Sequence, residues 1–273
     1  MYEIISNVQY DSNYKAYAHT DASGNIKDYF YRSLFGTSYS SPKLRSIKGL
    51  ALSRGANMAN GIAYATANGS GWHIGSWSQF SLIRTLLVLI SKSTDSQTSF
   101  GNGNFQGAVY LTTGTLSNAG QFYGYTSENQ QVKCFHVEGL WGDSTERLAG
   151  HFNSSGNRYV KMTPEGQGYF ANAVTGYTNL GAMTVSGQSG VYITNMTCNE
   201  YGLFPATSSG GSSSTYFCDM YAYWADRTFT AYQAGGCTTT TAGSTPKGGV
   251  FFVSFSIGVS SGHEQIGYSL SYV

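Results

Sequence analysis

The sequence predicts an α+β fold that is mostly antiparallel β-sheet, with one principal helix at about residues 77–92. Three observations support this fold class. Every second residue is apolar over much of the C-terminal part, which is the period of a strand with one buried face. One segment shows convincing helical spacing. The remainder consists of short aromatic or β-branched runs separated by glycine, serine and asparagine, which is typical of strands and turns.

The predicted helix begins with a capping pattern. Ser76 can cap the first turn, and Gln79 follows three positions later, as in a capping box. Lys92 falls in the last turn, where a cation interacts favourably with the helix dipole. The apolar positions with helical spacing are Trp77, Phe80, Ile83, Leu86, Leu87 and Ile90. A second, weaker helical turn is predicted from Ser144 to Leu148.

The C-terminal residues show the clearest β pattern. Every second residue is apolar from 251 to 259 and again from 266 to 272, with a polar turn between the two segments. This alternation predicts an antiparallel hairpin with one buried face. The side chains expected in the core are Trp72, Trp77, Phe80, Trp141, Phe255, Ile266 and Leu270.

The chain is expected to contain a main domain at 70–273, preceded by a β-rich extension at 1–69. The extension should supply strands to the same body or form a contact with another subunit or virion protein. The abrupt start would also fit a C-terminal piece of a longer protein. Two loop-like stretches, the Ser/Gly-rich 206–215 and the Thr-rich 238–243, are flanked by strand patterns and therefore do not mark domain boundaries.

The composition excludes several classes of protein. There are 15 Lys and Arg residues against 14 Asp and Glu residues, and charged residues make up only 11% of the chain. The many aromatic residues argue against disorder, and the balanced charge argues against nucleic-acid binding. The most apolar run, 82–90, contains Arg84 and is far shorter than the roughly 20 residues that span a bilayer, so no membrane insertion is expected.

Few residues form a pattern with known chemistry. No phosphate-binding loop, zinc-protease motif or nucleophile elbow is present. Glu138 and Glu146 could act as the paired carboxylates of a glycosidase, but a turn held by side-chain hydrogen bonds is the favoured interpretation. We therefore expect no enzyme activity and no cofactor.

The four cysteines are widely spaced and fit no zinc pattern. Free thiols are the favoured interpretation. A single disulfide, Cys198–Cys218 or Cys218–Cys237, is the alternative.

The segment 216–232 is unusually rich in Tyr, Trp and Phe. Tyr, Trp and Arg dominate binding sites because they offer rigid surface with a polar tip. The alternation of Tyr221 and Tyr223 also fits a buried aromatic strand pair. The segment is therefore either core or a ligand-binding surface.

Three blocks of the sequence, in order, resemble the C-type-lectin-like fold. They are GWHIGSWSQF at 71–80, VEGLWGDSTERLAG at 137–150, and the glycine-rich closing strands at 235–236, 248–252 and 266–270. The relevant branch contains the formylglycine-generating-enzyme domain, phage tropism determinants and retroelement-diversified variable proteins. In this resemblance Trp72 and Trp77 are the anchoring aromatic residues.

Departures from the family pattern limit what the resemblance implies. Thr145 and Arg147 stand where tryptophan is usual in the second block. Cys218 and Cys237 lack the Arg and Asn residues that surround the cysteine pair of the enzyme branch, so oxidase activity is not implied. The Glu-Pro-Asn motif of calcium-dependent sugar binding is also missing from the sequence.

Further segments, at 44–49, 89–97 and 100–103, resemble structural proteins in phages of gut anaerobes. The resemblance implies a phage virion protein of the tail fibre, baseplate or head fibre, assembled in the host cytoplasm. It would present a lectin-like surface to a host-cell receptor, either a glycan or a protein, and would contact other virion proteins as a homo-oligomer such as a trimer. The alternative is a purely structural capsid-decoration or tail-assembly module.

In the resembled variable proteins the ligand face corresponds to about 221–247 of this chain. The expected contact residues are Tyr221, Tyr223, Trp224, Arg227, Tyr232 and Thr240.

Overall fold

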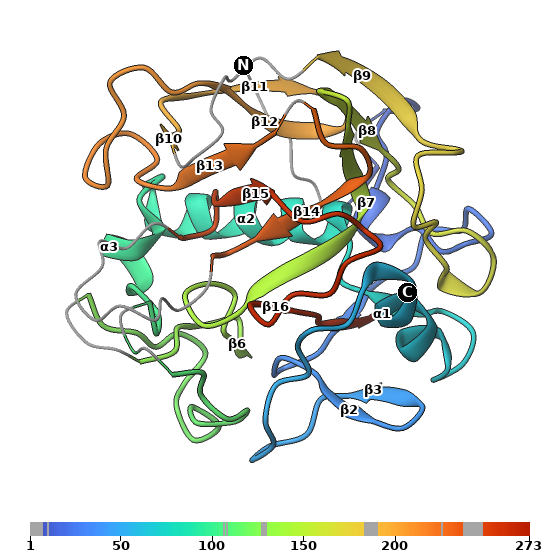
Figure 1. Cartoon of the computed structure of the whole chain (residues 1–273), viewed down its shortest axis with the longest axis horizontal. Helices are drawn as coiled ribbons and strands as arrows, with labels where there is room; N and C mark the ends of the chain where they lie inside the picture. Colours follow the sequence, from blue (N-terminus) through green and yellow to red (C-terminus); the bar gives the residue numbers. More distant parts are fainter. Residues whose placement is uncertain are drawn as a thin grey trace.

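The computed structural model describes residues 8–9, 11–105, 107, 109–126, 130–182, 191–224, 226–236 and 248–273. Within these residues, a large sheet, several small sheets and three α-helices form the fold (Figure 1). The helices are α1 (Met58–Thr66), α2 (Trp77–Ser91) and α3 (Ser96–Phe100), with short 3-10 turns at Tyr17–His19 and Gly166–Gly168. None of the helices in the described ranges is both long and apolar enough to cross a bilayer.

Helix α2 confirms the predicted principal helix. It begins at Trp77, and the Ser76 hydroxyl accepts a hydrogen bond from the Gln79 amide at 3.4 Å. Lys92 ends it in a left-handed conformation with φ of 54°. The apolar face is buried through Leu87, whereas Ile90 is exposed.

Helix α1 is an element that the sequence analysis missed. Asn57 caps it by accepting a hydrogen bond from the Asn60 amide at 2.9 Å. Its buried residues Met58, Ile62 and Ala65 follow helical spacing. The cap and this spacing were the available signals.

The large sheet is mixed but mainly antiparallel. Its order is β10 (Val191–Tyr192), β13 (Met220–Tyr223), β15 (Val253–Phe255), β14 (Thr230–Ala234), β7 (Thr145–Ser154), β8 (Asn157–Val160) and β9 (Thr178–Ala182), and β16 (Ile266–Gly267) also pairs with β7. The pairs β13–β15 and β7–β16 are parallel, and the others are antiparallel. Helix α2 packs against β7 (Figure 1).

Strand β7 contradicts the predicted helical turn from Ser144 to Leu148. All ten of its residues are buried, because β14, β8 and β16 pair with it and both of its faces are covered. A strand covered on both faces loses the period-two pattern that would identify it. Gly150 lies within β7 at φ of 87°, and the register with β14 shifts across this stretch.

The smaller sheets include one with three strands, in the order β1 (Tyr31–Arg32), β17 (Leu270–Tyr272) and β4 (Trp72–Ile74). The two-stranded sheets pair β2 (Ser38–Ser40) with β3 (Lys43–Arg45), β5 (Lys133–Cys134) with β6 (Val137–Glu138), and β11 (Asn195–Asn199) with β12 (Gly202–Thr207). Strand β1 therefore joins the N-terminal segment to the C-terminal strand of the same body.

The predicted C-terminal hairpin is wrong. Strand β15 lies between β13 and β14 in the large sheet, whereas β17 pairs with β1 and β4 in the three-stranded sheet. Each segment alternates because it buries apolar side chains, but alternation does not determine which strand becomes the partner.

Two hydrophobic clusters form the core. The first packs α2 against the large sheet, and the second packs α1 against β4, β17 and part of β7. The expected core residues Trp77, Phe80, Trp141, Phe255, Ile266 and Leu270 are all buried, while Trp72 is half-buried.

Candidate functional site

The loop between β13 and β14 carries a tryptophan–arginine pair. The Arg227 guanidinium lies over the Trp224 ring, with its central carbon 4.5 Å from the ring centroid. Arg227 is exposed and Trp224 is half-buried. Phe229, which is 39% exposed, follows in the same loop. We call Trp224, Arg227 and Phe229 the Trp224–Arg227 edge.

The backbone of this edge is hydrogen-bonded to neighbouring turns. The Ser155 amide donates to the Arg227 carbonyl at 2.9 Å, and the Val259 amide donates to the Phe229 carbonyl at 2.8 Å. The Arg227 side chain also donates to the Ser256 carbonyl. The pair is therefore held in place before any ligand binds, which limits the ordering entropy lost on binding.

Two of the expected contact residues lie in the core instead. Tyr221 and Tyr232 are each 1% exposed and belong to the first hydrophobic cluster. Their expected role as surface contacts is therefore wrong for this structure. Successive residues of a strand face opposite sides of the sheet, so the sequence pattern fits either a core or a surface position. Here both rings lie on the side of the large sheet that packs into the first hydrophobic cluster. Tyr223 is half-buried, and Thr240 lies outside the described residues.

Tyr232 is part of a group of rings around a buried histidine. The His151 ring centroid lies 5.0 Å from that of Tyr232, 4.7 Å from that of Trp77 and 5.1 Å from that of Phe255. Among the described residues, neither ring nitrogen of His151 has a hydrogen-bond partner. Burial, followed by the nearby charge of Arg158, lowers the pKa of His151 well below its ordinary value.

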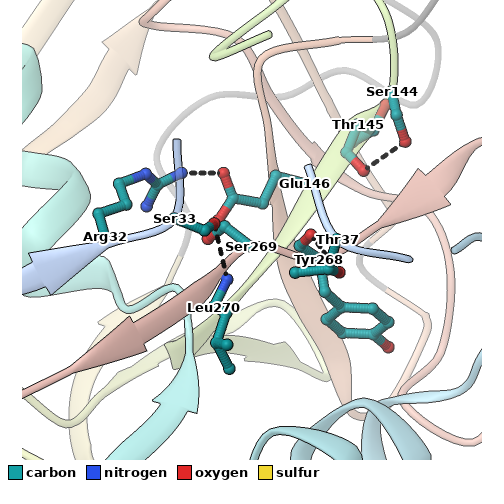
Figure 2. Close-up of polar contacts among 9 residues, drawn as sticks. All are labelled: Arg32, Ser33, Thr37, Ser144, Thr145, Glu146, Tyr268, Ser269 and Leu270. Atoms are coloured by element: carbon teal, nitrogen blue, oxygen red, sulfur yellow. Dashed lines mark hydrogen bonds and ion pairs between the residues drawn. The ribbon is translucent and has the colours of Figure 1, made fainter. Parts of the chain in front are cut away.

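A second polar region lies where the N-terminal segment meets β7 and the C-terminal strands. Arg32 on β1 forms an ion pair with Glu146 on β7, and the Ser269 hydroxyl donates to the other oxygen of that carboxylate (Figure 2). The Arg32 side chain is 5% exposed and the Glu146 side chain is 10% exposed. We call Arg32, Glu146 and Ser269 the Glu146 cluster.

Packing is tight on the side of the Glu146 cluster that faces Gly75. A Cβ atom on Gly75 would overlap the Glu146 carboxylate and the Ser269 hydroxyl. Beside the cluster, the Leu270 amide donates to Ser33 at 3.1 Å, and the Thr37 hydroxyl donates to the Tyr268 carbonyl at 2.8 Å (Figure 2). These contacts fasten the N-terminal segment to the C-terminal strands.

A cavity of about 40 Å³ borders the Glu146 cluster and is also lined by Glu138 and Asp143. Burial raises the pKa of both carboxyl groups. Glu138 accepts hydrogen bonds from the Gly114 and Leu116 amides at 2.9 and 3.0 Å.

Asp143 also accepts hydrogen bonds, from the Asn104 side chain at 2.7 Å and the Leu111 amide at 3.2 Å. Each of the three carboxylates, Glu138, Asp143 and Glu146, thus holds surrounding groups in place. The expected side-chain hydrogen bonds are present, but Glu138 lies in β6 and Glu146 in β7, so these residues do not form the expected turn-helix element.

The described part of the chain gives little support for a metal-binding site or a reactive thiol. It contains no group of three or more His, Cys, Asp and Glu side chains that could hold a metal ion. Cys134 and Cys218 are free thiols. Burial raises the pKa of both, that of Cys218 to about 12, which keeps these thiols protonated and poorly nucleophilic at neutral pH. Cys237 lies outside the described residues.

No family model matches the chain, and no curated protein matches it. The candidate site therefore depends on geometry and composition.

Proposed function

We propose that this protein is a phage virion component whose C-type-lectin-like domain presents the Trp224–Arg227 edge to a receptor on the host cell. The observation that carries the proposal is the exposed Arg227 guanidinium over the Trp224 ring at 4.5 Å. Such a pair offers a flat apolar surface and free N–H donors in one place, which suits sugar rings and protein side chains alike.

The fold assignment within this proposal draws on the three resembling blocks. Helix α2 begins inside the first block, at Trp77, one of the two anchoring aromatic residues. The second block spans the start of β7, and the closing block contributes β16. These positions are consistent with a rigid scaffold that displays loops, which is how the resembled proteins bind.

The test compares binding to cells by single-residue variants. Fluorescently labelled full-length protein is incubated with a panel of gut anaerobes, and bound label is measured by flow cytometry. On any strain that binds the parent, Trp224→Ala and Arg227→Ala should each lower affinity about 30-fold, the effect of losing a central contact residue. Arg45→Ala, which removes an exposed arginine on β3, is the matched control.

The alternative function is a structural module that binds other virion proteins. If both edge variants fold and bind like the parent, the receptor face lies elsewhere. If no strain binds, and a cryo-EM map of the assembled particle shows Trp224 covered by a neighbouring virion protein, the structural-module function replaces the receptor-binding proposal.

A further inference from the structure

Aromatic side chains form a row across the three-stranded sheet. Tyr31 on β1 lies opposite Tyr272 on β17, and Tyr272 lies opposite Trp72 on β4. Opposed residues of antiparallel strands project from the same face of a sheet. The ring centroids of Tyr31 and Tyr272 are 6.0 Å apart, and those of Tyr272 and Trp72 are 5.3 Å apart. Tyr29, two residues before Tyr31 along the chain, adds a further ring beside this aromatic row, 5.4 Å from that of Tyr31.

The side chains of the aromatic row are more exposed to solvent than they would be if they only shielded the core from water. Tyr29 is 62% exposed, Tyr31 is 54% exposed and Tyr272 is 37% exposed, while Trp72 is half-buried. The row therefore continues from the second hydrophobic cluster, against which Trp72 packs, out to solvent.

The backbone beneath the row is firmly held. The Ser33 amide donates to the Leu270 carbonyl at 2.8 Å, and the neighbouring Arg32 is paired with Glu146. The rings consequently stand on a preorganised support, and little order has to be created when a ligand binds.

The charges beside the row favour a neutral ligand. Lys27, whose charge lies close enough to interact with Tyr272, is paired with Asp21 at 2.9 Å. Arg32 is buried in its pair with Glu146. Asp28, the exposed neighbour of Tyr29, adds a carboxylate that would repel a polyanion. This charge distribution disfavours nucleic acid and anionic lipid.

We propose that the aromatic row binds a single chain of a neutral β-linked hexose polysaccharide. The C–H groups on one face of a hexopyranose are apolar and weakly positive, so they stack on the negative face of an aromatic ring. The spacing of the rings, 5.3 to 6.0 Å, is comparable with one sugar unit of an extended chain. A β-1,4-linked chain is extended like the row, a β-1,3-linked chain curves into a helix, and most α-linked chains coil.

The angles between neighbouring rings favour a single polysaccharide chain as the ligand over the flat surface of a crystalline polysaccharide. Neighbouring rings are inclined to one another by 53 to 73°. A crystalline polysaccharide surface could touch only one or two of them, but successive sugars of a flexible chain can turn to follow them. This site lies apart from the Trp224–Arg227 edge and does not rest on the receptor-binding proposal.

Affinity electrophoresis of the full chain tests the proposal, with soluble hydroxyethyl cellulose, laminarin, dextran or alginate in the gel. The extended hydroxyethyl cellulose should retard the protein most, the curved laminarin should retard it less, and the α-linked dextran and the anionic alginate should not retard it. Tyr31→Ala and Tyr29→Ala should each weaken retardation about tenfold. Tyr39→Ala removes a tyrosine that is 47% exposed on another sheet and is the matched control.

Several outcomes would overturn the inference. These are no retardation by either β-glucan, equal retardation of the parent and both row variants, and retardation by alginate alone. A parent that sediments as a dimer and becomes a monomer in Tyr31→Ala would instead assign the row to self-association. Tyr29 lies outside the strands, so its variant remains informative if Tyr31→Ala does not fold. Retardation is measured in gels and receptor binding on whole cells, and the Tyr29 and Tyr31 variants test only the first, so failure here is distinguishable from failure of receptor binding.

Discussion

Arg32 and Arg227 occupy two regions that use the same functional group differently. The Arg32 side chain is 5% exposed and faces the Glu146 carboxylate, where it joins the N-terminal segment to β7. Arg227 is exposed and lies over the Trp224 ring on a loop. A buried guanidinium must be paired to offset the loss of its hydration, whereas an exposed one keeps N–H donors for a ligand. The Glu146 cluster should therefore control stability, and the Trp224–Arg227 edge should control binding.

Removing the carboxylate of the Glu146 cluster should have the largest effect on stability. Glu146→Ala leaves Arg32 charged and buried without its partner, which should lower the free energy of unfolding by about 3–5 kcal/mol. Urea denaturation followed by circular dichroism measures this. Glu165→Ala, which breaks the more exposed Lys161–Glu165 pair, should cost less than about 1 kcal/mol. Equal losses in the two variants would contradict the structural role given to the Glu146 cluster.

Asp219 gives a pH test of a buried carboxyl group outside that cluster. It is 0% exposed, and burial raises its pKa to about 8 although the Phe251 amide donates to it at 2.7 Å. The folded state thus holds a proton that the unfolded state releases near pH 4. The stability contributed by this proton is fully present below about pH 4 and is lost as pH rises through about 8.

In Asp219→Asn this alkaline loss of stability should be absent, because the amide does not ionise. Melting temperatures of parent and variant, recorded from about pH 5 to about pH 9, make the comparison. Parallel curves for the two proteins would show that Asp219 does not carry the pH dependence.

The edge should bind with little dependence on salt. We expect stacking and hydrogen bonds to dominate there, because Arg227 is the only cation of the edge and its guanidinium lies against the Trp224 ring. Raising the salt concentration from about 0.1 M to about 1 M should weaken cell binding less than about tenfold. Flow cytometry over a salt series measures the slope. A steep decline would indicate that binding depends on ion pairs, and would contradict a central role for stacking on Trp224.

The contrast between buried and exposed side chains also bears on which features of the structure could be predicted from the sequence. Helix α2 was predictable because its cap at Ser76 and its apolar spacing are local signals. The pairing of the strands was not predictable. Apolar and polar residues alternate in both β15 and β17, yet long-range contacts place the two strands in different sheets. Tyr221 and Tyr232 have the residue type of a binding site, and only the packing of the large sheet shows that they are buried.

The smallest expected effect is that of the edge variants on folding. Arg227→Ala should lower the free energy of unfolding by less than about 1 kcal/mol, as is usual for exposed positions, and Trp224→Ala, at a half-buried position, by about 1–2 kcal/mol. The loop is held mainly through its backbone, by the bonds from Ser155 to Arg227 and from Val259 to Phe229, and these survive truncation of the side chains. Urea denaturation alongside Glu146→Ala gives the comparison. If Arg227→Ala proved as destabilising as Glu146→Ala, its bond to the Ser256 carbonyl would be a structural fastening, and the functional contrast between the two arginines would fail.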